Sequence, residues 1–453
     1  MASIFSRQAS PKQSNIFRVM TDNGYRTVLS PKYASEISRL PNLSFGKIMS
    51  TEFHAWLPGF DPFFQFDLSD TFQKAVRMKL TQALGRIAKP LSDEASHALK
   101  HHWTDNPEWH EFPLKPTILQ IVAQLSSRVF LGEKICRDPD WLRITVDYTV
   151  ESFRANEELR TWPDFLRPFV ARFPASCVKV RASLRGAREI ITPVLEERRR
   201  NKQSALEKGQ TEPRYNDAME WMEQTSKGRP YDHVAVQLTF SVSAIHTTSD
   251  MMTQALYDLC TRPGLVEALR KEIIEVISTD GWKKTAMYKL QLMDSFLKES
   301  QRMKPINLVS MRRIAEDNIR LSDGTQIAKG TSIMVAGEWM RDAQFYEDPE
   351  TFDAYRFLKM RQIPGNQASA QFVSPSPEHL GFGFGNHACP GRFFVANEIK
   401  IAMCHILLKY DLKLAEGSVP QYRRYGFSNQ ADPLAQISAR RRREEIALEE
   451  ISG

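Results

Sequence analysis

A stretch without any helix breaker, from His233 to Cys260, limits the folds open to this chain more than any other feature. It contains neither glycine nor proline, follows the candidate N-cap Asp232, and stops just before Arg262-Pro263. We expect a single helix of about 28 residues, roughly 42 Å long. A helix of that length crosses a molecule of this size and is able to carry a central site.

The rest of the sequence is mostly helical in pattern, with strand signals at two places. Apolar and polar residues alternate from Phe17 to Pro31 around an Asn-Gly turn, which predicts a β-hairpin. Residues 33–206 show helical spacing with few strand signals. β-Branched residues around an Asp-Gly turn predict further strands between Ile314 and Val335. The predicted fold class is therefore mainly α with a minor β region.

We expect one domain over residues 17–453, after a flexible N-terminus at residues 1–16. The chain has 453 residues, 42% of them hydrophobic, which is enough for the core of one large enzyme domain. Its C-terminal tail, ARRRREEIALEE, is densely charged and is interpreted as a solvated helix.

Charge and cysteine content exclude some classes of protein. The net charge of +7 permits an acidic partner, a membrane surface or nucleic acid without choosing among them. The five cysteines form no C-x-x-C pair, which argues against a disulfide framework, a zinc site and an iron–sulfur cluster, and indicates a reducing compartment. No uninterrupted apolar run reaches about 18 residues, so the sequence predicts no transmembrane helix.

The segment FGFGNHACPGR, from Phe382 to Arg392, carries the most specific chemistry. It places the Cys389 thiol between two glycines, so that backbone N–H groups are able to approach the sulfur and stabilise a thiolate, as a metal ligand requires. Neither G-x-G-x-x-G nor a P-loop is present, and no cysteines for an iron–sulfur cluster lie nearby. On these residues alone, a buried and inert cysteine remains the alternative.

The same segment matches the pattern F-x-x-G-x-[RH]-x-C-x-G, and through it the chain resembles the cytochrome P450 monooxygenases. The matching positions are Phe382, Gly385, His387, Cys389 and Gly391. The resemblance implies a haem-thiolate fold in which Cys389 binds the iron of haem b and His387 meets a haem propionate. It extends over nearly the whole chain, from about Phe17 to near Pro433.

Further matches lie upstream of the cysteine in the order that the family shows. Glu299-Ser-Gln-Arg302 matches E-x-x-R, whose spacing places both charges on one helical face, and Arg356 matches the arginine of the segment that follows. The resemblance implies that these three residues form an ion network near the haem. Arg313 matches an arginine that pairs with a propionate. Arg77 matches another cofactor-binding arginine, but the tryptophan or histidine usual four residues earlier is a glutamine, so a solvated arginine remains the alternative.

The oxygen-activation motif [AG]-G-x-[DE]-T falls on AIHTT, where Ile245 replaces glycine and Thr247 replaces the acid. Helical geometry places Ala244 and Thr248 within roughly 40° of each other and turns His246 about 160° from Thr248, which predicts a packed or solvent-linked histidine rather than a second iron ligand. The resemblance implies that the Thr248 hydroxyl faces dioxygen, with Thr247 continuing a relay to water. The variant motif resembles fungal monooxygenases of secondary metabolism.

The substrate side is predicted to be apolar. Family position directs four residues toward the substrate: Ala244, Leu308, Val309 and Phe427. No charged group is obviously placed to recognise a carboxylate or a phosphate. The aromatic stretch from His54 to Phe66 fits a pocket-covering loop or an ordinary core segment.

The resemblance implies insertion of oxygen from O₂ into a lipophilic small molecule, such as a terpenoid or related secondary metabolite. Electrons would come from NADPH through a separate flavin reductase, docked on a basic face that includes Arg392 and Lys400. We expect a monomer that binds no nucleic acid, since no recognised module is present. Family members associate with the cytoplasmic side of the endoplasmic reticulum; without an anchor, this chain would be soluble or peripheral.

Two other functions fit the same motifs. One is a haem-thiolate isomerase or dehydratase without net oxygen insertion, suggested by the altered Ile245 and Thr247. The other is a non-catalytic haem-binding protein.

Overall fold

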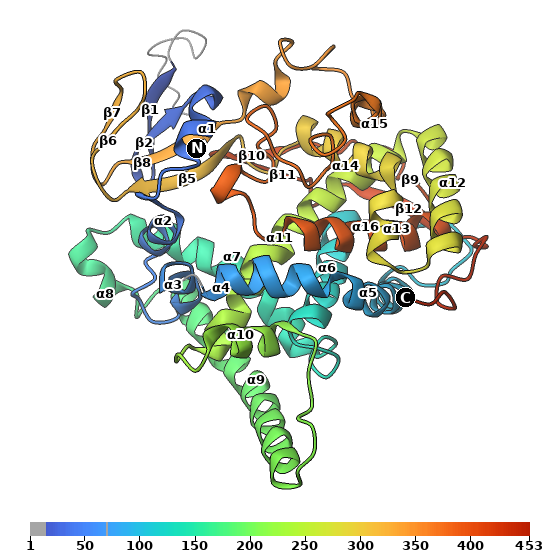
Figure 1. Cartoon of the computed structure of the whole chain (residues 1–453), viewed down its shortest axis with the longest axis horizontal. Helices are drawn as coiled ribbons and strands as arrows, with labels where there is room; N and C mark the ends of the chain where they lie inside the picture. The colour runs from blue at the N-terminus through green and yellow to red at the C-terminus, as the bar shows by residue number, and fades with distance from the viewer. Residues whose placement is uncertain (1–14, 69–70) are drawn as a thin grey trace.

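The computed structural model describes residues 15–68 and 71–453, in which helices form most of the body and a small sheet lies at one corner (Figure 1). The α-helices are α1 (Ala34–Ile37), α2 (Phe45–Glu52), α3 (Asp61–Leu68), α4 (Thr71–Lys74), α5 (Thr81–His102), α6 (Leu114–Phe130), α7 (Pro139–Arg160), α8 (Arg167–Val170), α9 (Ala175–Glu207), α10 (Ala218–Ser226), α11 (His233–Cys260), α12 (Pro263–Asp280), α13 (Lys284–Lys289), α14 (Gln291–Met303), α15 (Arg356–Gln362) and α16 (Arg392–Lys409).

The strands are short. They are β1 (Ile16–Thr21), β2 (Gly24–Leu29), β3 (Leu43–Ser44), β4 (His110–Pro113), β5 (Val309–Ala315), β6 (Ile319–Arg320), β7 (Gln326–Ile327), β8 (Ser332–Ala336), β9 (Tyr410–Leu414), β10 (Arg423–Tyr425), β11 (Ser428–Gln430) and β12 (Gln436–Arg441). The mainly α fold with a minor β region is confirmed.

The main sheet has five strands in the order β1-β2-β8-β5-β3. The antiparallel β1–β2 pair, with Thr21 opposite Gly24, confirms the predicted hairpin. Of the N-terminal segment expected to be flexible, residues 1–14 lie outside the described residues, and Ile16 already pairs with Leu29. The predicted strands between residues 314 and 335 are also present, although β5 begins earlier, at Val309.

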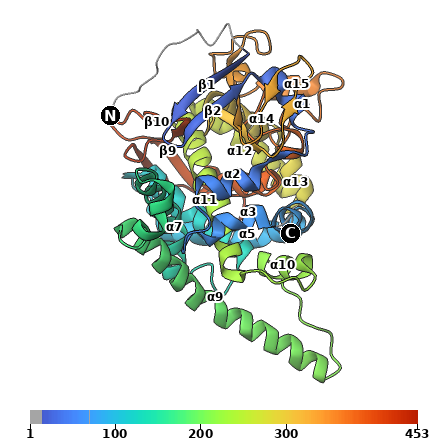
Figure 2. The ribbon, with the colours of Figure 1, turned by 90° about the vertical axis from the view of Figure 1, so that its left-hand side faces the viewer.

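Helix α11 has the bounds that the sequence predicts, and it crosses the centre of the molecule (Figures 1 and 2). The Asp232 side chain caps its start by accepting the N–H groups of Val234 and Ala235 at 2.9 and 3.0 Å. The absence of breakers and this cap explain why one helix spans the interior.

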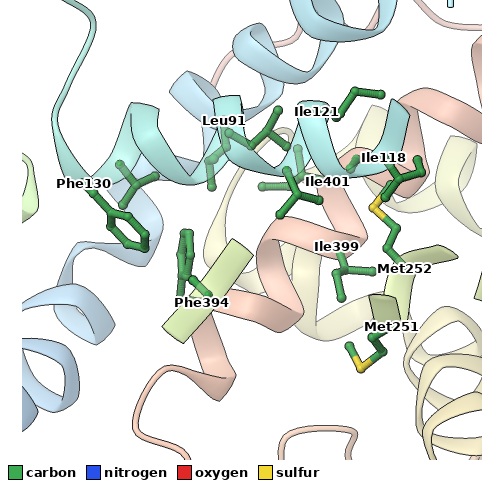
Figure 3. Close-up of a cluster of buried hydrophobic side chains, with 14 of the residues drawn as sticks. Leu91, Ile118, Ile121, Phe130, Met251, Met252, Phe394, Ile399 and Ile401 are labelled. Carbon is green, nitrogen blue, oxygen red and sulfur yellow. The ribbon is translucent and has the colours of Figure 1, made fainter. Parts of the chain in front are cut away.

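A buried apolar cluster joins α11 to the helix that follows the cysteine loop (Figure 3). Met251 and Met252 of α11 lie in this cluster with Ile118 of α6 and Ile399 of α16. Nearby, the rings of Phe130 and Phe394 pack with centroids 5.5 Å apart. The core therefore fixes α16 relative to α11.

The prediction that the C-terminal tail is a solvated helix is wrong. After Arg441, at the end of β12, residues 442–453 contain no helix. Leu448 is buried, and its carbonyl accepts a hydrogen bond from Trp282 Nε1 at 3.0 Å. Burial of this leucine fixes the chain in a conformation that its charge pattern does not indicate.

The aromatic stretch from His54 to Phe66 belongs mainly to the core. Helix α3 begins at Asp61, and Phe60 and Phe63 are buried. The rings of Phe53 and Phe63 stack with centroids 4.1 Å apart. The core alternative therefore accounts for these aromatic rings.

Helix α9, of 33 residues, projects from the body at its C-terminal end (Figure 2). None of the helices in the described part of the chain combines the length and the hydropathy needed to cross a bilayer.

Candidate functional site

The loop before α16 is shaped by glycines that no other residue replaces easily. Gly383 and Gly385 have φ values of +73° and +61°, in the left-handed region that favours glycine. A Cβ on Gly385 would lie 2.5 Å from Ser38 Cβ. The loop is closed by the Cys389 N–H, which donates to the Phe382 carbonyl at 2.7 Å. Cys389 is thereby held just before the N-terminus of α16.

The Cys389 sulfur lies in a setting suited to a thiolate that binds a metal. Burial raises the pKa of the Cys389 thiol, while the backbone N–H groups of Gly391 and Arg392 and the Arg392 charge oppose that rise. Arg392 also donates to the carbonyl oxygens of Val373 and Cys389, at 2.9 and 2.8 Å. The N–H groups of Gly391 and Arg392 and the Arg392 charge favour negative charge on the sulfur, as does the start of a helix.

Three cationic or ionisable groups gather beside this loop. Arg77 donates to the Asn386 carbonyl at 2.8 Å, and Arg313 reaches the His387 carbonyl at 3.4 Å. Burial, and then the Arg77 charge, lowers the pKa of Arg313 to about 9; burial, and then the Arg313 charge, lowers the pKa of His387 to about 4.

The donors of this group are partly unused. Arg313 Nε and His387 Nε2 are buried without a hydrogen-bond partner, and neither Arg77 nor Arg313 belongs to an ion pair among the described residues. Buried groups of this kind are normally satisfied. An anionic group such as the two propionates of haem fits them, because it supplies both the acceptors and the missing negative charge.

Glu299, Arg302 and Arg356 form one ion network. Arg302 donates to both Glu299 carboxylate oxygens at 2.8 Å, and Arg356 Nε lies 3.2 Å from each of them. Arg302 also donates to the carbonyls of Met340 and Pro349. The network fastens α14 to the irregular chain that leads toward the cysteine loop.

In the middle of α11, Thr248 is 1% exposed and its Oγ1 has no hydrogen-bond partner. Ala244 is buried one turn earlier on the same face. Thr247 Oγ1 donates to the Ser243 carbonyl at 3.1 Å. His246 Nε2 lies 3.1 Å from the Val146 carbonyl on α7, which confirms the predicted packed histidine.

The remaining candidate substrate contacts lie around the start of β5. The Leu308 N–H donates to the Phe427 carbonyl at 2.7 Å. Val309 is buried in a small cluster with Val28 and Met334, and Phe427 packs against that cluster. The structure thus brings Leu308, Val309 and Phe427 together, whereas Ala244 lies in the main helical core.

Sequence patterns missed two features near this site. Ser243 is exposed, as is Thr247, in the middle of α11, most of whose residues are buried. Asp250 binds Lys115 Nζ and the Ala431 N–H, both at 2.8 Å, and so ties α11 to the segment after β11. A serine and an aspartate within a helix match no motif. The one available signal was the presence of polar residues in a helix that was predicted to be central.

The expected place of Lys400 on a basic face is wrong. Lys400 is buried on α16, where its Nζ lies 2.5 Å from Asp294 Oδ1 and donates to the Met287 carbonyl. Arg392 is half-buried and binds backbone carbonyls. A buried charge needs a partner, and Lys400 finds one inside the protein rather than at the surface.

The comparisons with known proteins all point to one family. The family model described as cytochrome P450 matches residues 67–434. The chain is 52% identical over 433 residues to cytochrome P450 monooxygenase adrA of Penicillium rubens, covering 95% of this chain and 85% of the relative. It is 49% identical over 443 residues to cytochrome P450 monooxygenase trt6 of Aspergillus terreus, covering 97% and 90%.

A third relative, cytochrome P450 monooxygenase esdpI of Penicillium shearii, is 48% identical over 442 residues, covering 97% of this chain and 86% of the relative. These matches favour oxygen insertion over the isomerase, dehydratase and non-catalytic alternatives. The haem-thiolate resemblance is confirmed: the chain belongs to the cytochrome P450 family, as a haem-dependent monooxygenase of the fungal secondary-metabolism type.

Proposed function

We propose that Cys389 supplies the thiolate ligand of the haem iron, and that Arg77, Arg313 and His387 hold the haem propionates. The unused donors of Arg313 and His387 beside the cysteine loop support this proposal most directly. Phe382, Gly385 and Gly391 shape the loop. Bound haem supplies the chemistry that activates O₂. Glu299, Arg302 and Arg356 act as structural residues that hold the chain leading to this loop.

Thr248 is proposed to hold the proton that is delivered during oxygen reduction. Its buried hydroxyl has no partner in the protein, so both its proton and its lone pairs are available. Thr247 is proposed to accept a hydrogen bond from water on the solvent side, since its own hydroxyl proton is directed at the Ser243 carbonyl. This arrangement replaces the acid that the motif lacks.

The proposed substrate is a terpenoid or related lipophilic secondary metabolite. One oxygen atom of O₂ enters a C–H bond and the other leaves as water, with two electrons and one proton from NADPH and one further proton from solvent. Ala244, Leu308, Val309 and Phe427 are all apolar, which suits such a molecule. The electrons pass through a separate NADPH-dependent flavin reductase, and the enzyme acts as a monomer.

We also propose that the protein lies on the cytoplasmic face of the endoplasmic reticulum membrane. Three aromatic side chains between α7 and α9 support this: Phe165, Phe169 and Phe173 are 74%, 61% and 80% exposed. Aromatic side chains that extend into solvent at one corner suit a lipid interface. Sedimentation with phosphatidylcholine–phosphatidylserine vesicles is expected for the unmodified protein and should be lost in the triple serine variant; equal sedimentation of both would contradict the proposal.

The carbon monoxide difference spectrum of the dithionite-reduced protein tests the haem ligand. We expect a Soret band at the thiolate-ligated position in the unmodified protein and its loss in Cys389→Ala, while a band that survives the substitution would overturn the proposal. Turnover of terpenoids should then require both NADPH and O₂. Product formed without either would favour an isomerase or dehydratase.

A further inference from the structure

The helix that carries Arg77 contains a turn of a rare kind. Residues 71–102 are helical throughout, and they include a π-helical stretch, Ala75–Leu80, which we call the π-segment. The part of the chain that the structure describes has no other π-helical residues. A π-helix closes its hydrogen bonds at i+5 rather than i+4, and it occurs mostly as a single turn within an α-helix, frequently at a functional site.

The spacing of buried side chains explains why the helix changes its winding here. Phe72, Val76 and Leu80 are all buried, and each lies four residues after the one before. In an α-helix a step of four residues turns about 40° past a full circle, so Phe72 and Leu80 would face directions about 80° apart. A π-helix takes more residues per turn, because its bonds close one residue later, and so it brings these side chains closer to one face. Burial of the three side chains thus favours the π-segment.

The π-segment contacts the cysteine loop at two points. The Val76 side chain lies beside Gly391, where a Cβ would come 3.8 Å from Val76 Cγ1. One residue later, Arg77 donates to the Asn386 carbonyl at 2.8 Å. Arg77 is exposed, so its direction depends on the backbone beneath it rather than on packing. A relaxation of the π-segment to α geometry would rotate Arg77 relative to Leu80, which the core holds in place.

Thr81 stabilises the end of the π-segment through its side chain. Its N–H donates to the Met78 carbonyl, three residues back. Its hydroxyl donates to the Val76 carbonyl, five residues back, at 3.4 Å. The hydroxyl thereby takes the i+5 place that a backbone N–H holds inside a π-helix. This bond spans the residue that bears the guanidinium, since Arg77 lies between Val76 and Thr81.

We propose that Thr81 is a positioning residue: its hydroxyl stabilises the π-segment, and the π-segment directs Arg77 toward a haem propionate at the cysteine loop. The inference rests on the proposed role of Arg77 in holding haem. Without the hydroxyl, the π-segment relaxes toward the commoner α geometry and Arg77 turns away from the loop. Arg77 then holds haem less firmly, although its own side chain is unchanged.

The test measures the rate at which the haem-loaded full chain loses haem to excess apomyoglobin, and the reduction potential of the bound haem. Thr81→Val and Thr81→Ala both remove the hydroxyl but differ in bulk, so one remains if the other fails to fold. Thr81→Ser keeps the hydroxyl. Arg77→Met, alone and combined with Thr81→Val, shows whether the two residues act through one contact.

Thr117→Val on α6 is the matched control for the loss of a helix hydroxyl. Thr117 is half-buried like Thr81, and its hydroxyl donates to the Leu114 carbonyl at 2.8 Å. We expect Thr117→Val and Thr81→Ser to lose haem at the rate of the unmodified protein.

Thr81→Val and Thr81→Ala should speed haem loss about fivefold, the effect of roughly one hydrogen bond. The potential should become more negative in both, as in Arg77→Met, because a cation moves away from the haem. A substitution that only weakens the fold leaves the potential unchanged. In protein that already carries Arg77→Met, Thr81→Val should add nothing to the rate of haem loss.

The inference alone is overturned if Arg77→Met changes the rate and the potential while Thr81→Val and Thr81→Ala change neither. It is also overturned if the effects of Thr81→Val and Arg77→Met add, or if Thr81→Ser loses haem as fast as Thr81→Val. If Arg77→Met itself changes neither quantity, the proposed role of Arg77 is wrong, and the inference fails with it.

Discussion

Three residues of the site each carry a buried polar atom that has no hydrogen-bond partner, as do several residues elsewhere in the core. Thr248 Oγ1, Arg313 Nε and His387 Nε2 have no hydrogen-bond partner, although most buried polar atoms in proteins do. Each belongs to a residue that sequence motifs had singled out. The motifs locate such residues because their chemistry demands a particular side chain, but they do not reveal which atoms remain free.

The hydroxyl of Thr248 is open to a direct test. Thr248→Val keeps the shape of the side chain and removes the proton donor, so haem binding should persist while the fraction of NADPH electrons recovered in product falls about tenfold or more. Thr253→Val is the matched control, since Thr253 is also buried on α11 but its hydroxyl donates to the Ser249 carbonyl at 2.7 Å. Equal coupling in Thr248→Val and unmodified enzyme would argue against the proton role.

Glu398 predicts a pH dependence of stability. Burial raises the pKa of Glu398 to about 8 against the opposing hydrogen bond from Ser126, and Glu398 Oε2 has no partner. An acid whose pKa is raised on folding stabilises the fold below its unfolded pKa, about 4.5, and loses that contribution as pH rises toward 8. The free energy of unfolding of wild type should therefore fall between pH 5 and 8 relative to Glu398→Gln, by a few kcal/mol on the order of the pKa shift. Parallel urea titrations measure this difference; identical pH profiles would contradict it.

At the scale of elements, side chains of α14 organise the irregular chain between β8 and α16. Lys298 Nζ donates to the carbonyls of Ser369, Gln371 and Ser374, each at 2.8 Å. The E-x-x-R pattern predicted Glu299 and Arg302 but not Lys298, because a lysine on a helix ordinarily indicates a solvated face. Only the path of the distant loop reveals what this lysine binds.

Arg356 on α15 should contribute strongly to stability. Arg356→Ala leaves Glu299, which is fully buried, with only Arg302 and the Asp353 N–H as partners. We expect a loss of about 3 kcal/mol in the free energy of unfolding and a lower haem content. Lys359→Ala is the control on the same helix: its side chain is 71% exposed and pairs with Asp353, so the loss should stay below about 1 kcal/mol. Denaturant unfolding compares the two; similar losses would show that the network contributes little.

At the scale of the whole molecule, the C-terminal tail returns to the helical body. Its end lies beside α5 (Figure 1), where Lys89 Nζ donates to the Glu449 carbonyl at 2.8 Å. The Glu449 carboxylate also pairs with Lys409. One buried cluster contains residues from Phe53 through Leu448, while a single domain over residues 17–453 stays a prediction.

The tail is expected to stabilise the fold through Leu448. Leu448→Ala removes a fully buried side chain and should cost about 2 to 3 kcal/mol of unfolding free energy. Leu434→Ala is the control, since Leu434 is 70% exposed and its loss should be nearly neutral. Thermal melting of both variants measures the effect, and a Leu448→Ala melting temperature equal to that of wild type would contradict it.

The sequence by itself determined the bounds of α11, the loop that presents Cys389, and the ion network of Glu299. These features depend on local properties: the absence of breakers, an N-cap, glycines at left-handed positions, and fixed spacing of charges. Only the tertiary structure decided the fate of the tail, the burial of Lys400, and the exposure of Ser243. Each depends on which distant segment covers a side chain, and burial of that kind is a property of the packed chain rather than of any local pattern.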